Sequence, residues 1–315
     1  MPRVIANAEQ RSINLPEMID ALRTARPDPR DEDSFARFAP ELQALGNNRS
    51  FLSEIICAEL AEDCRNQQAV SAYGPQVIAL YQGDGVMVRA NCWPQARHSL
   101  VRNNRPESFF YDVPHDHNFS FLTLGYAGPG YLSDHFEYDH GSVAGAAGES
   151  VTLTPAARTR LEPGCTHLYR AHIDVHSQQP PEAFSVSLNI IEASATTPLR
   201  DQYVFDLANG RIAGLANPVA TASLLPLLAR LDGAEGRDLL NRFAERHPSD
   251  RIRYAAVTAL ADVAGDADTR AGVFERALAN GSLLVRTRAG EDLSKLAAMV
   301  SMNSTSDRIV ASNRS

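Results

Sequence analysis

Apolar and polar residues follow two different periods along this chain. Over residues 15–23 and 35–45, apolar positions recur every three or four residues, which is typical of amphipathic helices. From about Val77 the period shortens to two, as in strands with one buried face, and past Asn217 it lengthens again. The pattern therefore predicts helices at both ends of the chain and a β-rich region between them.

The β-rich region predicts many short strands separated by glycine and proline. Its first two strands, 76–81 and 86–93, flank Gly83-Asp84-Gly85, a sequence typical of a tight hairpin turn. Further strands are expected at 109–113, 119–126, 131–138, 150–153, 167–172 and 184–191. Because no helix intervenes between these strands, the order of elements favours an antiparallel barrel or sandwich over a βαβ fold.

The C-terminal region predicts a stack of helices with an internal repeat. Helices are expected at 219–231, 235–246, 249–264, 267–279 and 282–298. Ile252, Arg253, Ala256 and Leu260 recur 33 residues later as Val285, Arg286, Ala289 and Leu293. This period resembles HEAT-like repeats, in which helical hairpins stack on one another.

These patterns divide the chain into four segments. We expect an N-terminal helical flank at 1–72, a β-barrel domain at 73–200, an α-helical repeat domain at 201–300 and a flexible polar tail at 301–315. The predicted fold class is α+β with more than one domain.

Composition and charge narrow the functional classes. The chain has 315 residues, with 30 basic against 38 acidic side chains and a net charge of −8. Phosphate binding needs a basic surface, so neither nucleic acid nor a membrane is expected as a partner. No apolar run is long enough for a membrane helix, and the first residues lack the apolar core of a signal peptide, so a cytoplasmic location is expected.

Histidines cluster in the β-rich region. Seven of the nine lie in one stretch: His115, His117, His135, His140, His167, His172 and His176. Imidazole is the commonest ligand of first-row metals, so this clustering indicates a metal site. The pair in His115-Asp116-His117 is the sharpest signal, because residues i and i+2 of a strand face the same way and can reach one ion. The alternative interpretation is a pair of exposed loop histidines.

Around these histidines the chain resembles the cupin superfamily. The motifs Gly83-Asp84-Gly85, Cys92-Trp93-Pro94 and His115-Asp116-His117, followed by His176, have the order found in thiol dioxygenases of the cysteine dioxygenase type. The resemblance covers about residues 77–192 and implies a cupin-like barrel with a three-histidine metal site.

The resemblance also implies the ligands and the cofactor of this site. His115, His117 and His176 are the expected ligands, with His167 and His172 as rivals for the third position. Fe(II) is the implied cofactor, and O2 and a small polar metabolite, an amino acid or a thiol, are the implied reactants. Zn, Mn, Ni or Cu would suit the same imidazoles.

Three further residues are candidates for contact with the substrate. Arg89 and Arg170 can each bind a carboxylate in bidentate fashion, although an ion pair at the rim of the barrel is the alternative role. Tyr126 precedes the turn Gly128-Pro129-Gly130 and is a candidate to cover the mouth of the barrel, with packing against that turn as the alternative.

Other functions remain open on sequence alone. His135 and Glu137 have the His-x-acid spacing of 2-oxoglutarate-dependent oxygenases, with His176 as the distal ligand. Those enzymes hold 2-oxoglutarate with a basic residue shortly after the distal histidine, and none stands between His176 and Arg200. A redox-neutral isomerase is a second alternative. A third is a non-catalytic cupin that binds a ligand, or a protein partner through the C-terminal helices. Homodimer formation is open as well.

Overall fold

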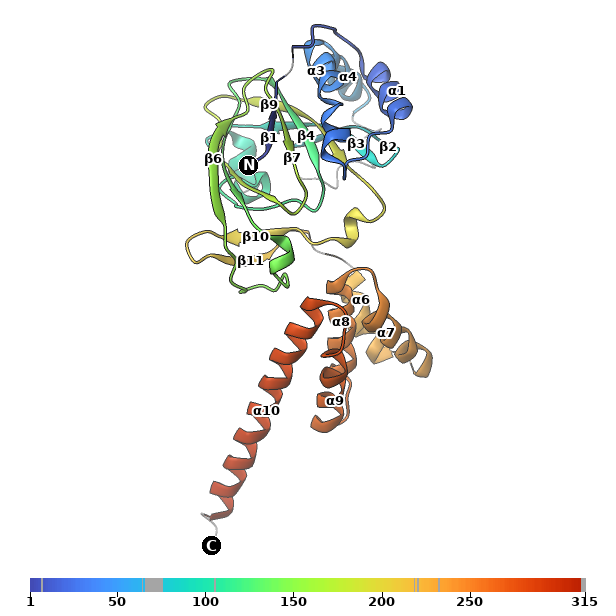
Figure 1. The fold of residues 1–315 in the computed structure, drawn as a ribbon, viewed down its shortest axis with the longest axis vertical. Helices are drawn as coiled ribbons and strands as arrows, with labels where there is room; N and C mark the ends of the chain where they lie inside the picture. Colours follow the sequence, from blue (N-terminus) through green and yellow to red (C-terminus); the bar gives the residue numbers. More distant parts are fainter. Residues whose placement is uncertain are drawn as a thin grey trace. The chain divides into compact units, whose positions relative to one another are not determined.

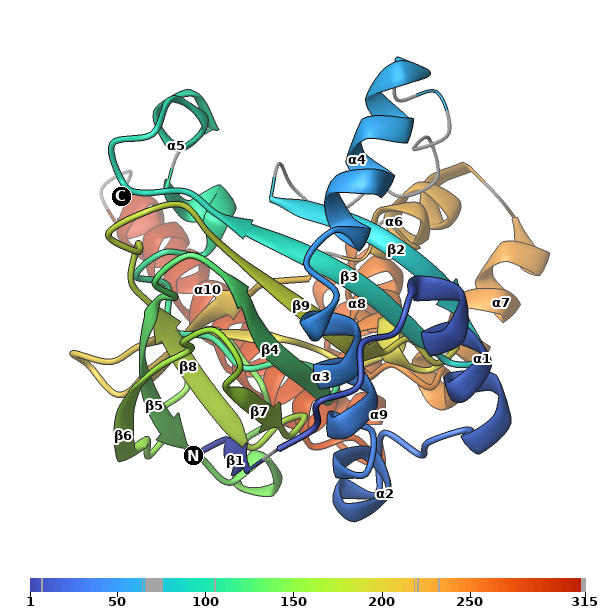
Figure 2. The same cartoon turned by 90° about the horizontal axis from the view of Figure 1, so that it is seen from above.

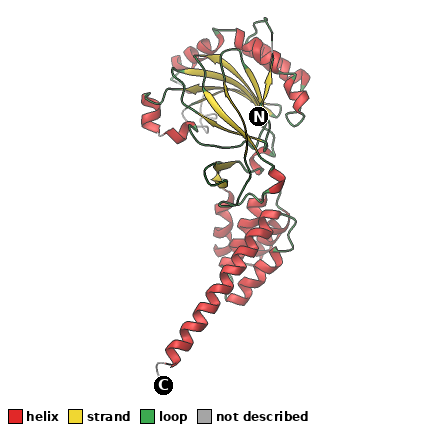
Figure 3. Ribbon diagram, turned by 60° about the vertical axis from the view of Figure 1, so that its left-hand side comes forward, coloured by secondary structure: helices red, strands yellow, loops and turns green. Residues whose placement is uncertain are grey.

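A computed structural model describes residues 1–6, 8–63, 65, 76–104, 106–217, 219, 221–231 and 233–312. The chain forms two compact units (Figure 1). Unit 1 comprises Met1–His140, Ser150–Pro198 and Gln202–Ala216, and unit 2 comprises Gly141–Glu149, Leu199–Asp201 and the described residues from Asn217 onward. All described strands belong to unit 1, whereas unit 2 is helical (Figure 3). The predicted boundary between residues 72 and 73 lies outside the described residues.

Two antiparallel sheets and a hairpin form the frame of unit 1. Their strands are β1 (Arg3–Ile5), β2 (Val77–Gly83), β3 (Val86–Trp93), β4 (Phe121–Ala127), β5 (Leu132–Glu137), β6 (Thr154–Arg160), β7 (Thr166–Tyr169), β8 (Asp174–Gln178), β9 (Ser185–Glu192), β10 (Tyr203–Asp206) and β11 (Arg211–Leu215). The six-stranded sheet has the order β1-β7-β4-β9-β3-β2, the three-stranded sheet has the order β6-β5-β8, and β10 pairs with β11. The prediction of an α+β fold with antiparallel sheets is confirmed.

The closed barrel implied by the resemblance is not formed, because the ladders within the described residues end in separate sheets. The chain leaves the six-stranded sheet after β4 through Gly128-Pro129-Gly130 and enters β5 of the smaller sheet. Both glycines have positive φ, and a Cβ would lie 2.3 Å from the Phe184 carbonyl oxygen at Gly128 and 2.0 Å from that of Leu161 at Gly130. Only glycine fits this crossing.

Other strand predictions divide into confirmed and wrong. Asp84 and Gly85 both have positive φ and join β2 to β3 as a two-residue turn, which confirms the hairpin. The strand expected at 109–113 is wrong, because positive φ at Phe110 and Asp112 breaks the pleat. The sequence also missed β1, β6, β8, β10 and β11, which are short or lack apolar alternation.

One face of the six-stranded sheet packs against the N-terminal helices (Figure 2). These helices are α1 (Leu15–Ala25), α2 (Glu32–Ala36), α3 (Ala39–Asn47) and α4 (Phe51–Ala61). The strand residues on this face are apolar and buried: Val86, Val88, Ala90, Leu122, Leu124, Leu168, Leu188 and Ile190. We call this side the outer face; it carries the main apolar core of unit 1.

The opposite side of the six-stranded sheet, which we call the inner face, has a different composition. Alternate residues of the same strands point there and include Arg89, Asn91, Thr123, His167, Tyr169, Ser187 and Asn189. The ring of Tyr169 lies 4.7 Å from that of His176 on β8 and 5.9 Å from that of His135 on β5. The inner face therefore faces the three-stranded sheet. Polar, ionisable and aromatic side chains lie between the two sheets.

Unit 2 contains α6 (Thr221–Leu231), α7 (Ala234–Arg246), α8 (Asp250–Asp262), α9 (Ala267–Ala277) and α10 (Leu283–Ser312), while α5 (Ser99–Asn104) belongs to unit 1. These bounds confirm the five predicted C-terminal helices. α10 continues through the predicted tail to Ser312, and the flexibility of that segment stays a prediction. A helix that has already formed can be extended residue by residue without a further nucleation step, so α10 can continue into a polar sequence. Within the described part of the chain, no helix combines the length and apolar composition needed to cross a bilayer.

The repeated positions of α8 and α10 make the same local contacts. In each helix a serine accepts the backbone N–H three residues later, and an arginine donates to the carbonyl six residues earlier. The pairs are Ser249–Ile252 and Arg253–His247 in α8, and Ser282–Val285 and Arg286–Asn280 in α10. Assignment to HEAT-like repeats stays a prediction.

Candidate metal centre

The first two predicted ligands lie in an extended segment just before β4. The backbone of His115 exchanges two hydrogen bonds with that of His176 on β8, at 3.0 and 2.9 Å. On its other side, the N–H of Phe205 on β10 donates to the Pro114 carbonyl at 2.9 Å. Strands from two different parts of the chain therefore hold this segment, and one of them carries the third histidine.

Asp116, between the two ligands, is a fully buried carboxylate that orders the segment further. The hydroxyl of Tyr138 donates to its Oδ2 at 2.6 Å, and the N–H of Tyr203 donates to its Oδ1 at 2.6 Å. The Nδ1 of His172 lies 3.5 Å from the same Oδ2. With its side chain engaged by these partners, Asp116 points away from the metal position and fixes the backbone on which both ligands stand.

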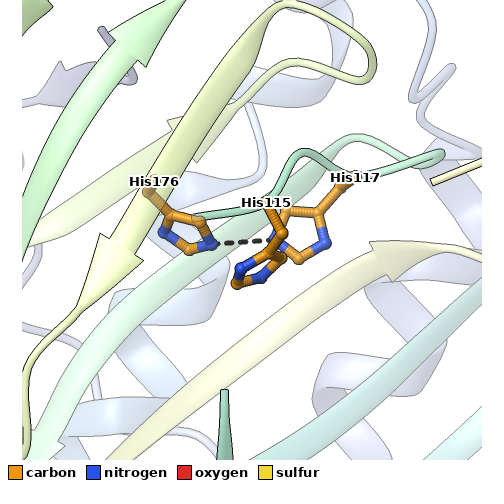
Figure 4. A group of neighbouring side chains, drawn as sticks. All are labelled: His115, His117 and His176. Carbon is orange, nitrogen blue, oxygen red and sulfur yellow. Dashed lines mark hydrogen bonds between the residues drawn. The ribbon is translucent and has the colours of Figure 1, made fainter. Parts of the chain in front are cut away.

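The structure brings His115, His117 and His176 together (Figure 4). Their side chains are 2, 8 and 1% exposed, and one ligand nitrogen from each lies within 4.8 Å of the others. The Nε2 atoms of His117 and His176 are 2.9 Å apart. In the part of the chain that is described, this is the one group of three His, Cys, Asp or Glu side chains with such spacing.

Burial keeps these imidazoles neutral. It lowers the pKa of His115 to about 4 and holds the pKa values of His117 and His176 well below the usual range. Repulsion from His115, when that ring is protonated, adds to the lowering of the pKa in both of the other rings. The Nδ1 of His115 faces the Val113 carbonyl at 2.7 Å and donates to it, which leaves Nε2 as the ligand atom. Near pH 7 each ring therefore offers a lone pair.

This donor set fits a divalent first-row ion. Nitrogen ligands at about 2.0–2.1 Å from one ion lie about 3 Å apart when they are adjacent, and the two Nε2 atoms above have this spacing. Three neutral ligands leave the ion its full charge and leave open positions for other molecules. The three histidines would hold the ion.

Aromatic rings surround the three histidines. The rings of Phe119 and Phe121 lie 4.9 and 4.7 Å from that of His117, and Phe121 stacks on Tyr169 at 4.5 Å. Together these rings form an apolar wall beside the ligands. Such a wall limits the access of water and strengthens electrostatic interactions at the site.

Arg89 is the one substrate-contact candidate on the inner face. Its charge contributes to the low pKa of His117, after burial and the charge of His115. In register it pairs with Asn189, which pairs with Thr123, which pairs with His167. A row of polar side chains thus crosses four strands beside the histidines. A role for Arg89 in substrate binding stays a proposal.

The other two contact candidates lie elsewhere. Arg170 donates to Asp174 and Glu137, both at 2.7 Å, so it occupies the ion-pair role. The ring of Tyr126 packs edge-on against Phe51 at 5.6 Å, on the outer face under α4. The parity of β4 explains this position: Tyr126 alternates with inward residues and points to the helices.

Among the residues that the structure describes, the remaining histidine alternatives are not assembled into a metal site. Glu137 binds Arg170 and the N-terminal amine of Met1, and the Nε2 of His135 pairs with Thr159 Oγ1 at 2.8 Å. The predicted His135–Glu137 ligand pair is therefore absent from the described ligand groups. Of the two rivals of His176, His172 has its ring 4.2 Å from that of His140, and His167 lies in the inner-face row.

Gln178 is a residue of the site that the sequence interpretation missed. Its Nε2 lies 3.1 Å from the Nε2 of His176, and the side chain is 4% exposed. Strand parity was the available signal, because Gln178 follows His176 by two residues. It went unused because β8 itself was not predicted.

No protein-family model and no curated protein matches this chain. Among solved structures, it is similar to salicylate 1,2-dioxygenase from Pseudaminobacter salicylatoxidans (TM-score 0.28, 13% identity, 49% of this chain and 37% of that chain). Streptomyces albus HEPD with 2-hydroxyethylphosphonate and Fe(II) bound is also similar (0.25, 16%, 39% and 22%). So is hydroquinone 1,2-dioxygenase from Sphingomonas sp. TTNP3 with 4-hydroxybenzoate bound (0.26, 12%, 40% and 71%). The chain spans little more than a third of the salicylate dioxygenase. Scores in this range define no family for this chain.

Proposed function

We propose that this protein is a mononuclear non-haem iron oxygenase that acts on a small polar metabolite at the three-histidine site. The observation that carries the proposal is the convergence of three buried, neutral imidazoles from two segments of the chain. Fe(II), when bound, supplies the redox chemistry with O2 that amino-acid side chains do not provide.

The side chains around the site have separate parts in this proposal. His115, His117 and His176 hold the ion, and the aromatic wall of Phe119 and Phe121 keeps water away. Arg89 carries the positive charge on the inner face that would orient an anionic substrate.

Metal content and oxygen uptake test the proposal together. Purified protein, reconstituted anaerobically with Fe(II), is expected to hold about one iron per chain and to consume O2 with a member of a panel of amino acids and thiols. His115→Ala and His176→Ala should lose both properties. Absence of stoichiometric metal after reconstitution would contradict the oxygenase function.

A redox-neutral metal enzyme, such as an isomerase, is the first alternative. It predicts substrate turnover with Zn(II) or Mn(II) under argon, whereas the proposed oxygenase stays inactive without O2. Comparing the two metals with and without O2 separates these functions.

A protein-binding module is the second alternative, and one observation favours it. On α6, Leu224, Leu227 and Leu231 are 59, 52 and 77% exposed and lie on one side of the helix. Leu224→Glu with Leu227→Glu would abolish complex formation under this alternative and leave the metal content unchanged.

A further inference from the structure

Three amide side chains on the interior side of the two sheets carry polar atoms that lack a hydrogen-bond partner among the described residues. Asn91, Gln178 and Asn189 are 5, 4 and 2% exposed. The atoms concerned are Oδ1 of Asn91, Oε1 of Gln178 and Nδ2 of Asn189. Burying a polar atom without a partner destabilises a fold, so three such atoms in one interior need a reason.

The three amides come from strands of both sheets and face the interior that holds the histidine site. Asn189 lies opposite Arg89 in the ladder between β3 and β9, and Asn91 follows Arg89 by two residues on the same face. Gln178 comes from the opposite sheet, with its amide nitrogen 3.1 Å from the Nε2 of His176. The unpartnered atoms therefore belong to one interior, bounded by Arg89 on one sheet and by His176 on the other.

Hydrogen-bond donors and acceptors occupy different positions in this interior, and their arrangement indicates which chemical groups a ligand must carry. Arg89 and the Nδ2 of Asn189 form a donor pair on adjacent strands, which suits the two oxygens of a carboxylate. Asn91 and Gln178 present only acceptor atoms without partners, so they need a ligand group that donates.

Packed aromatic side chains lie beside the amides of the six-stranded sheet. The ring of Trp93 lies 4.2 Å from Tyr131 and 6.1 Å from Tyr111, and its Nε1 donates to Ser187 Oγ at 3.0 Å. Ser187 is the cross-strand partner of Asn91. These packed rings bound the amide side of the interior.

We propose that this interior is the substrate subsite and that it binds a small amino acid or hydroxy acid. The carboxylate lies on Arg89 and Asn189, and the ammonium or hydroxyl group donates to Asn91 and Gln178. The inference rests on the proposed function for the place of the metal, but the subsite itself is made by residues that are not metal ligands.

Binding of matched probes tests the subsite without turnover. Titration calorimetry on the full chain, metal-free and loaded with redox-inactive Zn(II), would use serine, cysteine, leucine and phenylalanine. Each is compared with its hydroxy-acid analogue, its plain carboxylate and its decarboxylated amine. At least one amino or hydroxy acid should bind about tenfold more tightly than both of its one-group analogues. Equal binding of a one-group analogue, or no binding of any probe, would overturn the proposal.

Two variants locate the carboxylate. Arg89→Met should weaken carboxylate binding about tenfold or more, because the charged hydrogen bonds between the guanidinium and the carboxylate are lost. Binding of the decarboxylated amine should stay unchanged. Arg170→Met is the matched control, since it removes an arginine that already binds two carboxylates, Asp174 and Glu137. Asn189→Asp should also weaken carboxylate binding, because it places a negative charge opposite Arg89. Circular dichroism checks the fold of each variant, and equal effects of Arg89→Met and Arg170→Met would contradict the subsite.

Failure of this inference and failure of the proposed function have different signatures. Arg89-dependent binding in a protein that takes up no metal would support the subsite and exclude the oxygenase. Oxygen uptake with a substrate that lacks a carboxylate would support the oxygenase and overturn the subsite.

Discussion

The two faces of the six-stranded sheet are made by the same strands and are equally buried, yet they carry opposite chemistry. On β9, Leu188 faces the helices and Asn189 faces the histidine site, and they are 0 and 2% exposed. On β3, Ala90 and Asn91 are divided in the same way, at 0 and 5%. Burial by itself therefore does not distinguish a core from a site.

The difference lies in what burial costs on each side. On the outer face, apolar side chains gain free energy when they leave water. On the inner face, histidines and amides lose solvation, and the described partners do not fully replace it. The outer face thus stabilises unit 1, while the inner face uses part of that stability for binding.

Removal of a metal ligand should give the largest effect and should leave the outer face unchanged. His115→Ala and His176→Ala are expected to lose all stoichiometric metal, because two imidazoles hold an ion much less tightly than three. His167→Ala, on the inner face but outside the ligand group, should keep the metal. Elemental analysis of the three variants decides, and metal loss in His167→Ala with retention in His176→Ala would reverse the ligand assignment.

Acid should destabilise the protein through buried histidines in the interior between the two sheets. Burial lowers the pKa values of His135 and His167 to about 4, whereas an unfolded histidine titrates near 6.5. Between these values the unfolded chain binds more protons, so stability falls as the pH falls. The expected loss is about 2 kcal/mol per histidine from pH 7.5 to pH 5. Urea unfolding of metal-free protein measures it, and His167→Phe should flatten the slope; an unchanged slope would refute this origin.

Cavity formation on the outer face should lower stability without touching the site. Leu188→Ala is expected to cost about 2–5 kcal/mol, because the side chain is fully buried in the apolar core. Urea unfolding gives the stability, and elemental analysis should show unchanged metal content. A variant that folds but has lost its metal would mean that the faces are coupled.

Replacement of an inner-face amide should have the smallest effect on stability. Asn189→Leu keeps a similar volume and removes an unpartnered buried donor, so the free energy of unfolding should stay within about 1 kcal/mol or rise. Carboxylate binding should be lost. Strong destabilisation would show that Asn189 is needed by the fold and not by a ligand.

Much of this arrangement was predictable because it depends on local periodicity. The helical periods placed the C-terminal helices, and the Asp84-Gly85 turn defined the first hairpin. Two histidines separated by one residue are neighbours in any extended segment, so the pair His115 and His117 followed from spacing. The prediction of a strand at 109–113 was wrong because the positive φ values there depend on tertiary packing, which the hydrophobic periodicity does not reveal.

By itself, the sequence determined the order of a helical, a β-rich and a second helical region, the histidine pair, and the acidic charge that argues against nucleic-acid binding. Only the tertiary structure decided that His176 joins the pair, that Asp116 supports it, and that Tyr126 lies on the outer face while Arg89 lies on the inner one. The physical reason is chain separation: His117 and His176 are 59 residues apart. Contacts between residues so far apart in the sequence depend on which strands pair and on where the chain passes from one sheet to the other. Local periodicity shows only which way neighbouring residues face.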